Sequence, residues 1–522
     1  MIGVCGAGTM GRGIAQAAAL GGLGVRLHDP VPGALDGAGE RIAADLDRGA
    51  GRGRWSVDDA RAASARVTAA ARLDELGGCE LVIEAAPEDL ELKQRLFAQL
   101  ADVVAPDCVL ATNTSSLLVT AVAAATPHPE RVVGLHFFNP APLMRLVELV
   151  AGEASGEAAL ARAEAVGAAM GKRVIRAADV AGFVVNRCNR PFGLESLRLL
   201  QEQLTTVEQA DRICRRAGFR MGPFELMDLV GTDVGLDVSR SFYAQSFGEP
   251  RWRPSPLTVR LVAAGRTGRK SGRGWHDYRD GPHRPDDPPA PDPGGGDGRL
   301  VVVAGWGVLA AELREAAAAA GFDVREPAEA EGDPPWLILD CGADESDPPL
   351  QGGPQAVLCA AGSLAALDPE GAAAGFHALP PLAATAAIEV TRTGTTSGLA
   401  AERLETFVTA IGRHAEPVGD APGLVLGRIV CQLVNEAAFA LGEGVASAAD
   451  IDAGMELGLN HPRGPLAWGD AIGLDHVLAV LDGLADEYGE ERYRAAPGLR
   501  RRVLEGRLGT AVGGGFHDAE GT

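Results

Sequence analysis

The stretch that most constrains the fold is the glycine-rich segment MIGVCGAGTMGRG. Apolar residues 2–5 predict a strand, and Ala-rich residues 10–20 predict a helix that follows the glycines. Between the two, Gly6 allows a tight turn, Gly8 lets the backbone approach a bound group, and Gly11 lets helix and strand pack closely. A strand, a glycine turn and a helix N-terminus in this order indicate a site for a dinucleotide diphosphate.

The next apolar run, VRLHD, predicts a second strand and ends in Asp29. A carboxylate at this point accepts hydrogen bonds from the ribose hydroxyls of adenosine and repels a 2′-phosphate. The sequence therefore favours NAD over NADP.

Composition excludes several classes of function. A formal net charge of -22 argues against nucleic acid as a partner. The eight cysteines form neither a CxxC pair nor a cluster with histidine, so we expect no metal site and no disulfide framework. With no charged leader and no long apolar run either, we expect a cytoplasmic protein that has no membrane partner.

The chain alternates short β-rich runs with Ala-rich segments as far as residue 180, which predicts an α/β Rossmann-type domain over 1–180. Helical periodicity dominates 181–278, the range of an expected all-α domain. Residues 279–298 are rich in Pro and Gly and predict a linker without packed elements. The strands expected in the first domain are Ile2–Cys5, Val25–His28, Leu81–Ala85, Val109–Thr112, Val132–Leu135 and Leu146–Val150.

Beyond the linker the pattern repeats, because RLVVVAGWGVLAAEL again reads as strand, glycine turn and helix. Further on, FHALPPLAATAAIEV matches LHFFNPAPLMRLVELV, so that His377 and Glu389 correspond to His136 and Glu148. We infer a tandem duplication whose second copy is reduced. Its expected domains are a degenerate Rossmann-like domain over 299–420 and a second helical domain over 421–522.

Four polar residues of the first copy suggest hydride transfer from a secondary alcohol. His136 lies at the end of the predicted strand Val132–Leu135 and Glu148 lies in the next predicted strand, while Ser115 lies in NTSSL and Asn186 in AGFVVNR. An imidazole oriented by a carboxylate suits the removal of a hydroxyl proton, and the other two can bind the oxygen. The alternatives are a structural histidine, a Glu148 that pairs with a nearby arginine, and an ordinary capped turn at NTSSL.

The segments GAGTMGRGIAQ, VIEAAPEDLELK, NTSSL, GLHFFNPAPLMRLVELV and AGFVVNR together resemble the L-3-hydroxyacyl-CoA dehydrogenase family over residues 1–280. The resemblance implies NAD-dependent oxidation of (S)-3-hydroxyacyl-CoA, with His136 and Glu148 as the catalytic dyad and Ser115 and Asn186 at the substrate. The glycine loop and the resemblance together predict these NAD-binding residues: Gly6, Gly8, Thr9, Met10, Gly11, Asp29, Glu88, Lys93, Asn113, Ser115, Asn139 and Lys270.

The resemblance also concerns the substrate. RGAGRGRW lies where the family contacts CoA, which implies a role for Arg52 and Arg54 in binding phosphate. The alternative is a solvated basic surface. GLNHPRGPLAWGDAIGLDHVLAVLDGLADEYGEERYR is similar to the long bacterial members that act on 3-hydroxyadipyl-CoA or 3-hydroxybutyryl-CoA in phenylacetate or fatty-acid degradation, including β-oxidation. A dehydrogenase of free 3-hydroxy acids and a non-catalytic binding or structural relative remain as alternatives.

The second copy lacks several of these residues. In the sequence alignment, Gly362, Pro380, Gly427 and Ala511 stand at the places of Ser115, Asn139, Asn186 and Lys270 respectively. We therefore expect no catalysis there, and a helical domain kept for packing. The chain would then be an internal pseudo-dimer or a homo-oligomer.

Overall fold

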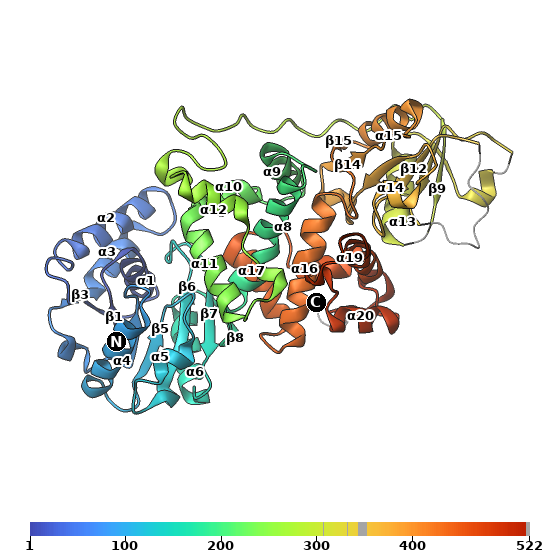
Figure 1. Cartoon of the computed structure of the whole chain (residues 1–522). Coiled ribbons are helices and arrows are strands. Elements are labelled where there is room, and N and C mark those ends of the chain that lie inside the picture. The colour runs from blue at the N-terminus through green and yellow to red at the C-terminus, as the bar shows by residue number, and fades with distance from the viewer. Residues whose placement is uncertain (306, 331, 343–351, 518–522) are drawn as a thin grey trace. The chain divides into compact units, whose positions relative to one another are not determined.

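The computed structural model describes residues 1–305, 307–330, 332–342 and 352–517 (Figure 1). The chain divides into two compact units. The first unit holds Met1–Arg187 and Glu443–Leu459, and the second holds Cys188–Gly442 and the chain from Asn460 onwards. The units are not the two copies, since each contains segments of both.

The first unit is built on an eight-stranded sheet in the order β3-β2-β1-β4-β5-β6-β7-β8. Neighbouring strands are parallel except for β6 and β7. This confirms the predicted doubly wound class. The strands are β1 (Ile2–Cys5), β2 (Val25–His28), β3 (Val67–Ala70), β4 (Leu81–Glu84), β5 (Val109–Thr112), β6 (Val132–Phe137), β7 (Leu146–Ala151) and β8 (Arg173–Ala178).

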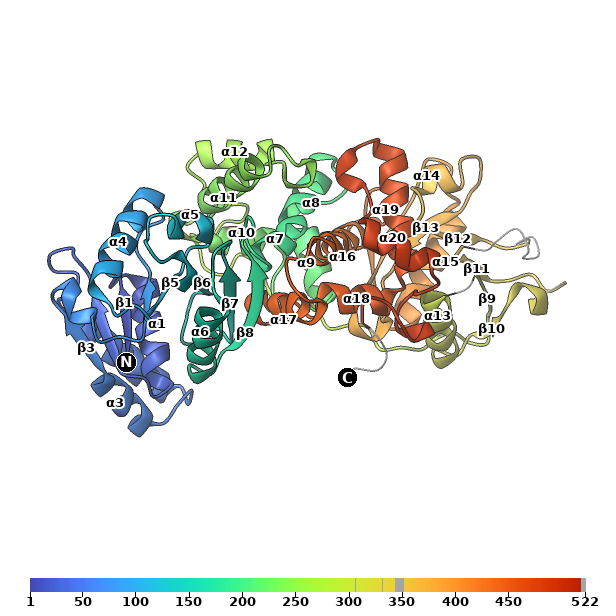
Figure 2. The same cartoon turned by 90° about the horizontal axis from the view of Figure 1, so that it is seen from below.

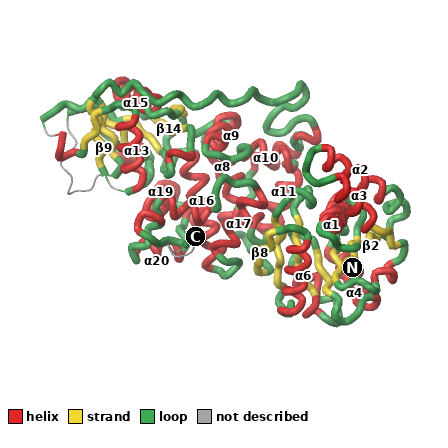
Figure 3. The backbone as a smooth tube through the Cα atoms, turned by 180° about the vertical axis from the view of Figure 1, so that it is seen from behind, coloured by secondary structure: helices red, strands yellow, loops and turns green. Residues whose placement is uncertain are grey.

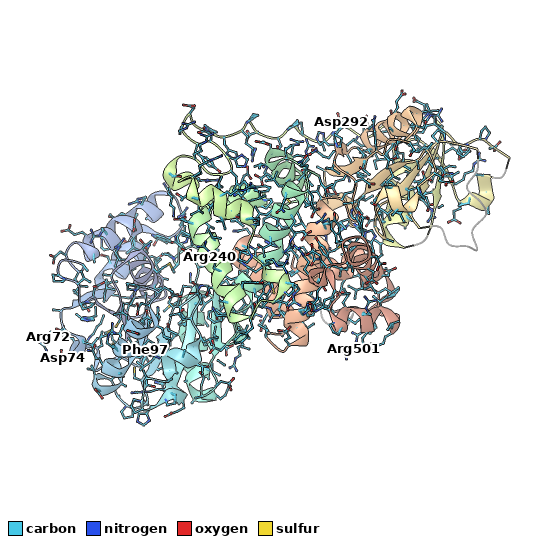
Figure 4. All side chains as sticks on the ribbon, in the orientation of Figure 1. Arg72, Asp74, Phe97, Arg240, Asp292 and Arg501 are labelled. Atoms are coloured by element: carbon cyan, nitrogen blue, oxygen red, sulfur yellow. The ribbon has the colours of Figure 1, made fainter. Side chains whose placement is uncertain are left out.

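Helices cover both faces of this sheet. The main core lies between the strands and α1, α2, α3 and α6, which contribute buried residues such as Ile14, Ile42 and Leu160. On α4, Phe97 is fully buried (Figure 4). The helices are α1 (Thr9–Leu20), α2 (Ala38–Gly51), α3 (Val57–Arg66), η1 (Leu73–Leu76), α4 (Leu90–Val103), α5 (Val119–Ala123), η2 (Pro129–Arg131), α6 (Glu157–Ala169), α7 (Val185–Cys188) and α17 (Ala448–Leu459).

The sequence prediction missed β3 and β8, the two edge strands of the sheet. An edge strand has a neighbour on one side only, so its sequence needs less apolar character than a central strand. In β3, Thr68 and Ala69 are exposed, and β8 carries Arg173 and Arg176 on its exposed positions.

The second unit contains a seven-stranded sheet in the order β10-β9-β11-β12-β13-β14-β15. The order matches the first sheet without its edge strand β3, so the reduced second copy keeps a complete central sheet. The strands are β9 (Leu300–Ala304), β10 (Asp323–Arg325), β11 (Leu337–Asp340), β12 (Gln355–Leu358), β13 (Ala374–His377), β14 (Ala387–Thr391) and β15 (His414–Pro417). Between β10 and β11, the described residues hold one short 3-10 helix where the first copy has α2, α3 and β3.

Helices from both copies make up the rest of the second unit, and α8 packs against the long helix α16. From the first copy come α8 (Arg190–Gln201), α9 (Val207–Arg216), α10 (Pro223–Val230), α11 (Thr232–Gln245), η3 (Pro250–Trp252), α12 (Pro256–Ala263) and η4 (Arg269–Ser271). From the second come α13 (Val308–Ala319), η5 (Pro327–Ala330), α14 (Leu364–Leu367), η6 (Leu382–Ala384), α15 (Gly398–Ala410), α16 (Leu426–Gly442), α18 (Pro465–Ile472), α19 (Leu474–Tyr488), η7 (Glu491–Tyr493), α20 (Pro497–Leu504) and η8 (Thr510–Val512).

The Pro- and Gly-rich segment 279–298 forms neither helix nor strand, as predicted, and is drawn as a long loop in Figure 3. It is nevertheless held by polar contacts along its length. Asp287 accepts two hydrogen bonds from Arg215, and the amide of Gly294 donates to Ala410. Asp292, labelled in Figure 4, lies between these contacts and is exposed.

Each sheet is packed against a helix from the other copy. In the first unit α17 lies against β7 and β8 (Figure 2), and the amide of Ala178 donates to Val445 at 2.8 Å. In the second unit Arg212 of α9 donates to Glu416 of β15 at 2.8 Å, and the amide of Gly419 donates to Leu204 at 2.8 Å. The two backbone bonds occupy equivalent places in the repeat, so the exchange of helices is reciprocal.

No helix in the part of the chain that the structure describes combines the length and the apolar character needed to cross a membrane.

Candidate active site

The glycine loop has the geometry that the motif predicts. Gly6 has φ +110°, and a Cβ there would lie 2.5 Å from the carbonyl oxygen of Ala85. A Cβ on Gly11 would lie 1.8 Å from the carbonyl oxygen of Gly6, whereas one on Gly8 would meet nothing within 4 Å. Open space over Gly8, at the uncapped N-terminus of α1, fits the diphosphate of NAD.

Asp29 is tied to this loop. Its Oδ2 accepts from the amide of Ala7 at 2.7 Å, and its Oδ1 accepts from the amide of Val31 at 2.9 Å. Each carboxylate oxygen has two lone pairs, so both retain capacity for a ribose hydroxyl. Thr9 and Met10 lie in the first turn of α1, next to the loop.

His136 and Glu148 are direct cross-strand neighbours on β6 and β7. The distance from His136 Nδ1 to Glu148 Oε2 is 2.6 Å, and the glutamate is fully buried. An ionised carboxylate only accepts, so the imidazole donates from Nδ1, and its neutral form keeps a lone pair on Nε2. A histidine oriented in this way suits the role of a general base.

Two backbone amides hold the glutamate. Glu148 Oε1 accepts from the amides of Val184 and Val185 at 3.0 and 2.9 Å. The turn that presents them places Phe183 at φ +52°, a conformation that is costly for a bulky residue. The rings of Phe138 and Phe183 lie beside the His136 ring, with centroids 4.6 and 5.8 Å away.

A polar cluster follows strands β4 and β5. Glu88 Oε1 accepts from Thr114 Oγ1 at 2.6 Å and from the amide of Ser115 at 3.1 Å. Burial acts to raise the pKa of Glu88, but the charge of Lys93 and the hydroxyl hydrogen bonds outweigh it and lower that pKa. Ser115 is thus placed by a carboxylate that stays ionised.

Sequence reasoning missed Glu84, the last residue of β4. Its carboxylate binds Lys93 Nζ at 2.7 Å and Thr112 Oγ1 at 2.7 Å, and both Glu84 and Lys93 are buried. The sequence did offer one sign of its importance, because Glu84 is a charged residue in the otherwise apolar run LVIEAA. Lys93 also lies 3.2 Å from Glu88, which makes it the link between the two carboxylates.

The other predicted residues are distributed as follows. Asn113 Oδ1 accepts from the amide of Phe137 at 2.8 Å and so joins the ends of β5 and β6. Asn139 is exposed in the loop after β6, and Asn186 lies in α7. Lys270 belongs to the second unit, where it pairs with Asp233 at 2.7 Å.

Arg52 and Arg54 lie on a cavity of about 230 Å³ in the first unit. Two further arginines line it, Arg12 from α1 and Arg48 from α2, neither of which the sequence analysis singled out. The loop over residues 139–143 forms another wall. Four guanidinium groups against the single carboxylate of Asp45 make the cavity suited to phosphate. No cluster of His, Cys, Asp or Glu with metal-ligand geometry occurs within the described ranges.

The second copy retains its histidine and glutamate as cross-strand neighbours, but they do not form a dyad. His377 Nε2 lies 3.1 Å from His476 Nε2, and within the described structure His377 Nδ1 has no hydrogen-bond partner. Glu389 accepts from the amides of Val425 and Leu426, as Glu148 does from the equivalent amides of Val184 and Val185. Burial, with nearby Glu416 adding to it, raises the pKa of Glu389 to about 8.

Glycine at 427 explains part of this difference, because a Cβ there would lie 2.2 Å from Cε1 of His377. The imidazole therefore occupies space that any side chain at 427 would need.

One detail of the sequence alignment is wrong. Asp179 accepts from the amide of Val119, and its equivalent Asp420 accepts from the amide of Leu364. This register puts Ala360, not Gly362, at the place of Ser115. The short strand β12 gave the sequence comparison too little pattern to fix the register, and the serine is missing in either alignment.

Comparison with known proteins agrees with the fold and the site. Residues 1–180 match the NAD binding domain of 3-hydroxyacyl-CoA dehydrogenase, and residues 182–278 and 423–519 each match its C-terminal domain. The 3-hydroxyadipyl-CoA dehydrogenase of Escherichia coli K12 is 36% identical over 504 residues, which cover 96% of this chain and 97% of the relative. A 3-hydroxybutyryl-CoA dehydrogenase of Mycobacterium tuberculosis is 41% identical over 53% of this chain and 98% of its own length.

Among solved structures, 3-hydroxybutyryl-CoA dehydrogenase from Escherichia coli K12 aligns with a TM-score of 0.82 and 34% identity, covering 97% of this chain and 98% of that one. The similarity thus extends through both copies. With a dinucleotide loop, a buried histidine–glutamate pair and a relative matched over nearly its whole length, the chain belongs to the 3-hydroxyacyl-CoA dehydrogenase family.

Proposed function

We propose that this chain oxidises (S)-3-hydroxyacyl-CoA to 3-oxoacyl-CoA with NAD, as its family does. The observation that carries the proposal is the 2.6 Å hydrogen bond between His136 Nδ1 and the buried Glu148. It lies in the same unit as the open glycine loop and the arginine-lined cavity. Base, cofactor loop and phosphate cavity are therefore all parts of the first copy.

In the proposed mechanism, His136 Nε2 removes the proton of the 3-hydroxyl group. Glu148 keeps the ring oriented and stabilises the imidazolium that forms, while its own charge is held by the amides of Val184 and Val185. Ser115 and Asn186 are proposed to position the reacting oxygen. NAD, when bound, supplies the acceptor for the hydride.

The residues proposed for NAD are those of the loop, Asp29 and the cluster around Glu88, with Asn113, Asn139 and Lys270. The CoA phosphates are proposed to bind Arg52 and Arg54, joined by Arg12 and Arg48 of the same cavity. Guanidinium groups form paired hydrogen bonds with phosphate, which supports this assignment. The substitution Arg52→Ala should raise the KM for the CoA ester, because one of these charges is lost.

A substrate comparison tests the function. NADH formation, followed by absorbance, is compared for 3-hydroxybutyryl-CoA, 3-hydroxyadipyl-CoA and free 3-hydroxybutyrate. We expect turnover with at least one CoA ester and much less with the free acid. A preference for the free acid would indicate a non-CoA dehydrogenase, and no turnover with any of the three would indicate a binding or structural relative.

The second copy is proposed to be non-catalytic and to take the place of a partner subunit. The reciprocal packing of α17 and α9 supports this internal pseudo-dimer. A fragment over residues 1–281 that is soluble, stable and fully active would contradict it. All eight cysteines are buried and none forms a disulfide in the described structure, which supports the further proposal of a reducing, cytoplasmic location.

A further inference from the structure

Lysine is rare in this chain, since only Lys93, Lys172 and Lys270 occur among 48 basic residues. The site described above uses the other two and leaves Lys172 without a role. Its ammonium donates to the carbonyl oxygens of Ala141 and Met144 at 2.6 and 2.7 Å. Both acceptors lie in the loop over residues 138–145, which joins β6 to β7.

This loop connects the strand of His136 to the strand of Glu148 and forms part of the arginine-lined cavity. It also packs closely on α1, because a Cβ on Gly13 would lie 3.4 Å from Ala141 Cβ. The loop therefore links the two catalytic strands to the wall of the cavity that we assign to CoA. Among the described hydrogen bonds, the loop is linked to residues 172 and 173 at the start of β8 only by those of Lys172 and by the 2.7 Å bond from the amide of Arg173 to Arg145.

The second copy provides a natural comparison. Arg413 stands at the place of Lys172, directly before β15 as Lys172 is directly before β8. It donates to Leu382, the equivalent of Ala141, and to its own neighbour Gly412, and its Nε has no partner in the described structure. Arginine thus reproduces one of the two loop contacts and not the other.

We propose that Lys172 is a positioning residue for substrate binding, because its ammonium holds the 138–145 loop in the shape that completes the CoA cavity. The proposal rests on the proposed function in one respect, the identity of the ligand as CoA. A lysine is required because its compact head reaches two carbonyls at once. Burial lowers the pKa of Lys172 to about 8, but a neutral amine still has two N–H groups, one for each carbonyl.

The test compares Lys172→Met and Lys172→Arg in the full chain with Arg413→Met, the matched change in the second copy. Calorimetric binding of CoA, KM and kcat for 3-hydroxybutyryl-CoA, and the unfolding temperature are measured for each. For Lys172→Met we expect CoA affinity to fall and KM to rise about tenfold, a change of about 1.4 kcal/mol, with kcat nearly unchanged. Lys172→Arg should recover part of the loss, and Arg413→Met should change neither constant.

Three results would overturn the proposal: unchanged CoA affinity in Lys172→Met, an effect on kcat alone, or an equal loss of affinity in Arg413→Met. A lowered unfolding temperature with normal affinity would show that Lys172 only stabilises the fold. If the wild type bound CoA but turned over no CoA ester, the proposed function would fail, while weaker binding in Lys172→Met would still support the role of the lysine.

Discussion

His136 and Glu148 face each other across β6 and β7, as His377 and Glu389 do across β13 and β14. In the first pair the carboxylate binds the imidazole at 2.6 Å. Backbone amides bind the glutamate of both pairs, but in the second pair the histidine contacts His476 and not the glutamate. The same two residues in the same register therefore do not suffice for a dyad.

The surroundings of each pair make the difference. In the second copy Gly427 leaves room for the ring of His377. The contact with His476 uses His377 Nε2, the nitrogen that a substrate hydroxyl would need. After the equivalent glycine turn of the first copy stands Val234, which is 45% exposed and cannot form such a bond. A dyad thus requires a glutamate that binds the Nδ1 of the histidine. It also requires that no other side chain bind the Nε2 of that histidine.

The largest effect is expected from the histidines. His136→Ala should reduce kcat by ~10²–10⁴-fold, the usual contribution of a general base, and leave NAD binding intact. The matched change His377→Ala should leave kcat near the wild-type value. Steady-state NADH formation and NAD titration measure both. Equal losses in the two variants would contradict the assignment of catalysis to the first copy.

A smaller effect concerns pH and Glu389. Its pKa of about 8 means that the folded chain keeps this carboxyl protonated where the unfolded chain ionises it. Between about pH 4.5 and pH 8 the folded state therefore binds more protons, so this group lowers the free energy of unfolding as pH rises, by up to about 1.4 kcal/mol per pH unit.

Glu389→Gln should remove the pH dependence that this carboxyl causes. The free energy of unfolding of the variant should therefore rise relative to that of the wild type as pH rises. Urea unfolding at about pH 5 and about pH 7.5 measures the difference. A stability difference that is the same at both values would show that Glu389 is ionised in the folded chain.

The smallest effect is expected at Gly427. The added methyl group of Gly427→Ala would lie 2.2 Å from His377 Cε1, and such overpacking costs about 1–3 kcal/mol. Gly442→Ala is the matched control on the same helix, where a Cβ meets nothing within 4 Å. Thermal unfolding should show a loss for the first variant and none for the second. Similar midpoints would mean that the His377 ring moves aside at little cost.

Much of the first site could be predicted from sequence because its signals are local. The glycine turn is a property of consecutive residues, and two strands joined by a short loop place His136 opposite Glu148. The amides that hold Glu148 could not be predicted, since they depend on the unusual backbone of Phe183. The place of Arg12 in the arginine-lined cavity could not be predicted either, because it depends on how α1 packs against α2.

The second copy was harder to interpret. Its conserved spacing suggested an intact pair, and only the packed structure shows His476 against His377. The second sheet lacks only the edge strand β3, and within the described ranges α2, α3 and α4 have no counterpart either. These include the elements that carry Arg48 and end beside Arg52 in the first copy, so the described second copy has no equivalent of that wall of the cavity.

The glycine face of α17 has a consequence for how such a chain can evolve. Additional Cβ atoms on Gly454 and Gly458 would lie 3.3 Å from Val185 Cγ2 and Cγ1, and Val185 is one of the two residues whose amides hold Glu148. Selection on the first active site therefore extends to a helix encoded more than two hundred residues away. The second copy can lose its own catalytic residues without affecting the first site. A deletion that removed α17 would instead expose Val185, whose amide binds Glu148. The duplication is therefore difficult to reverse.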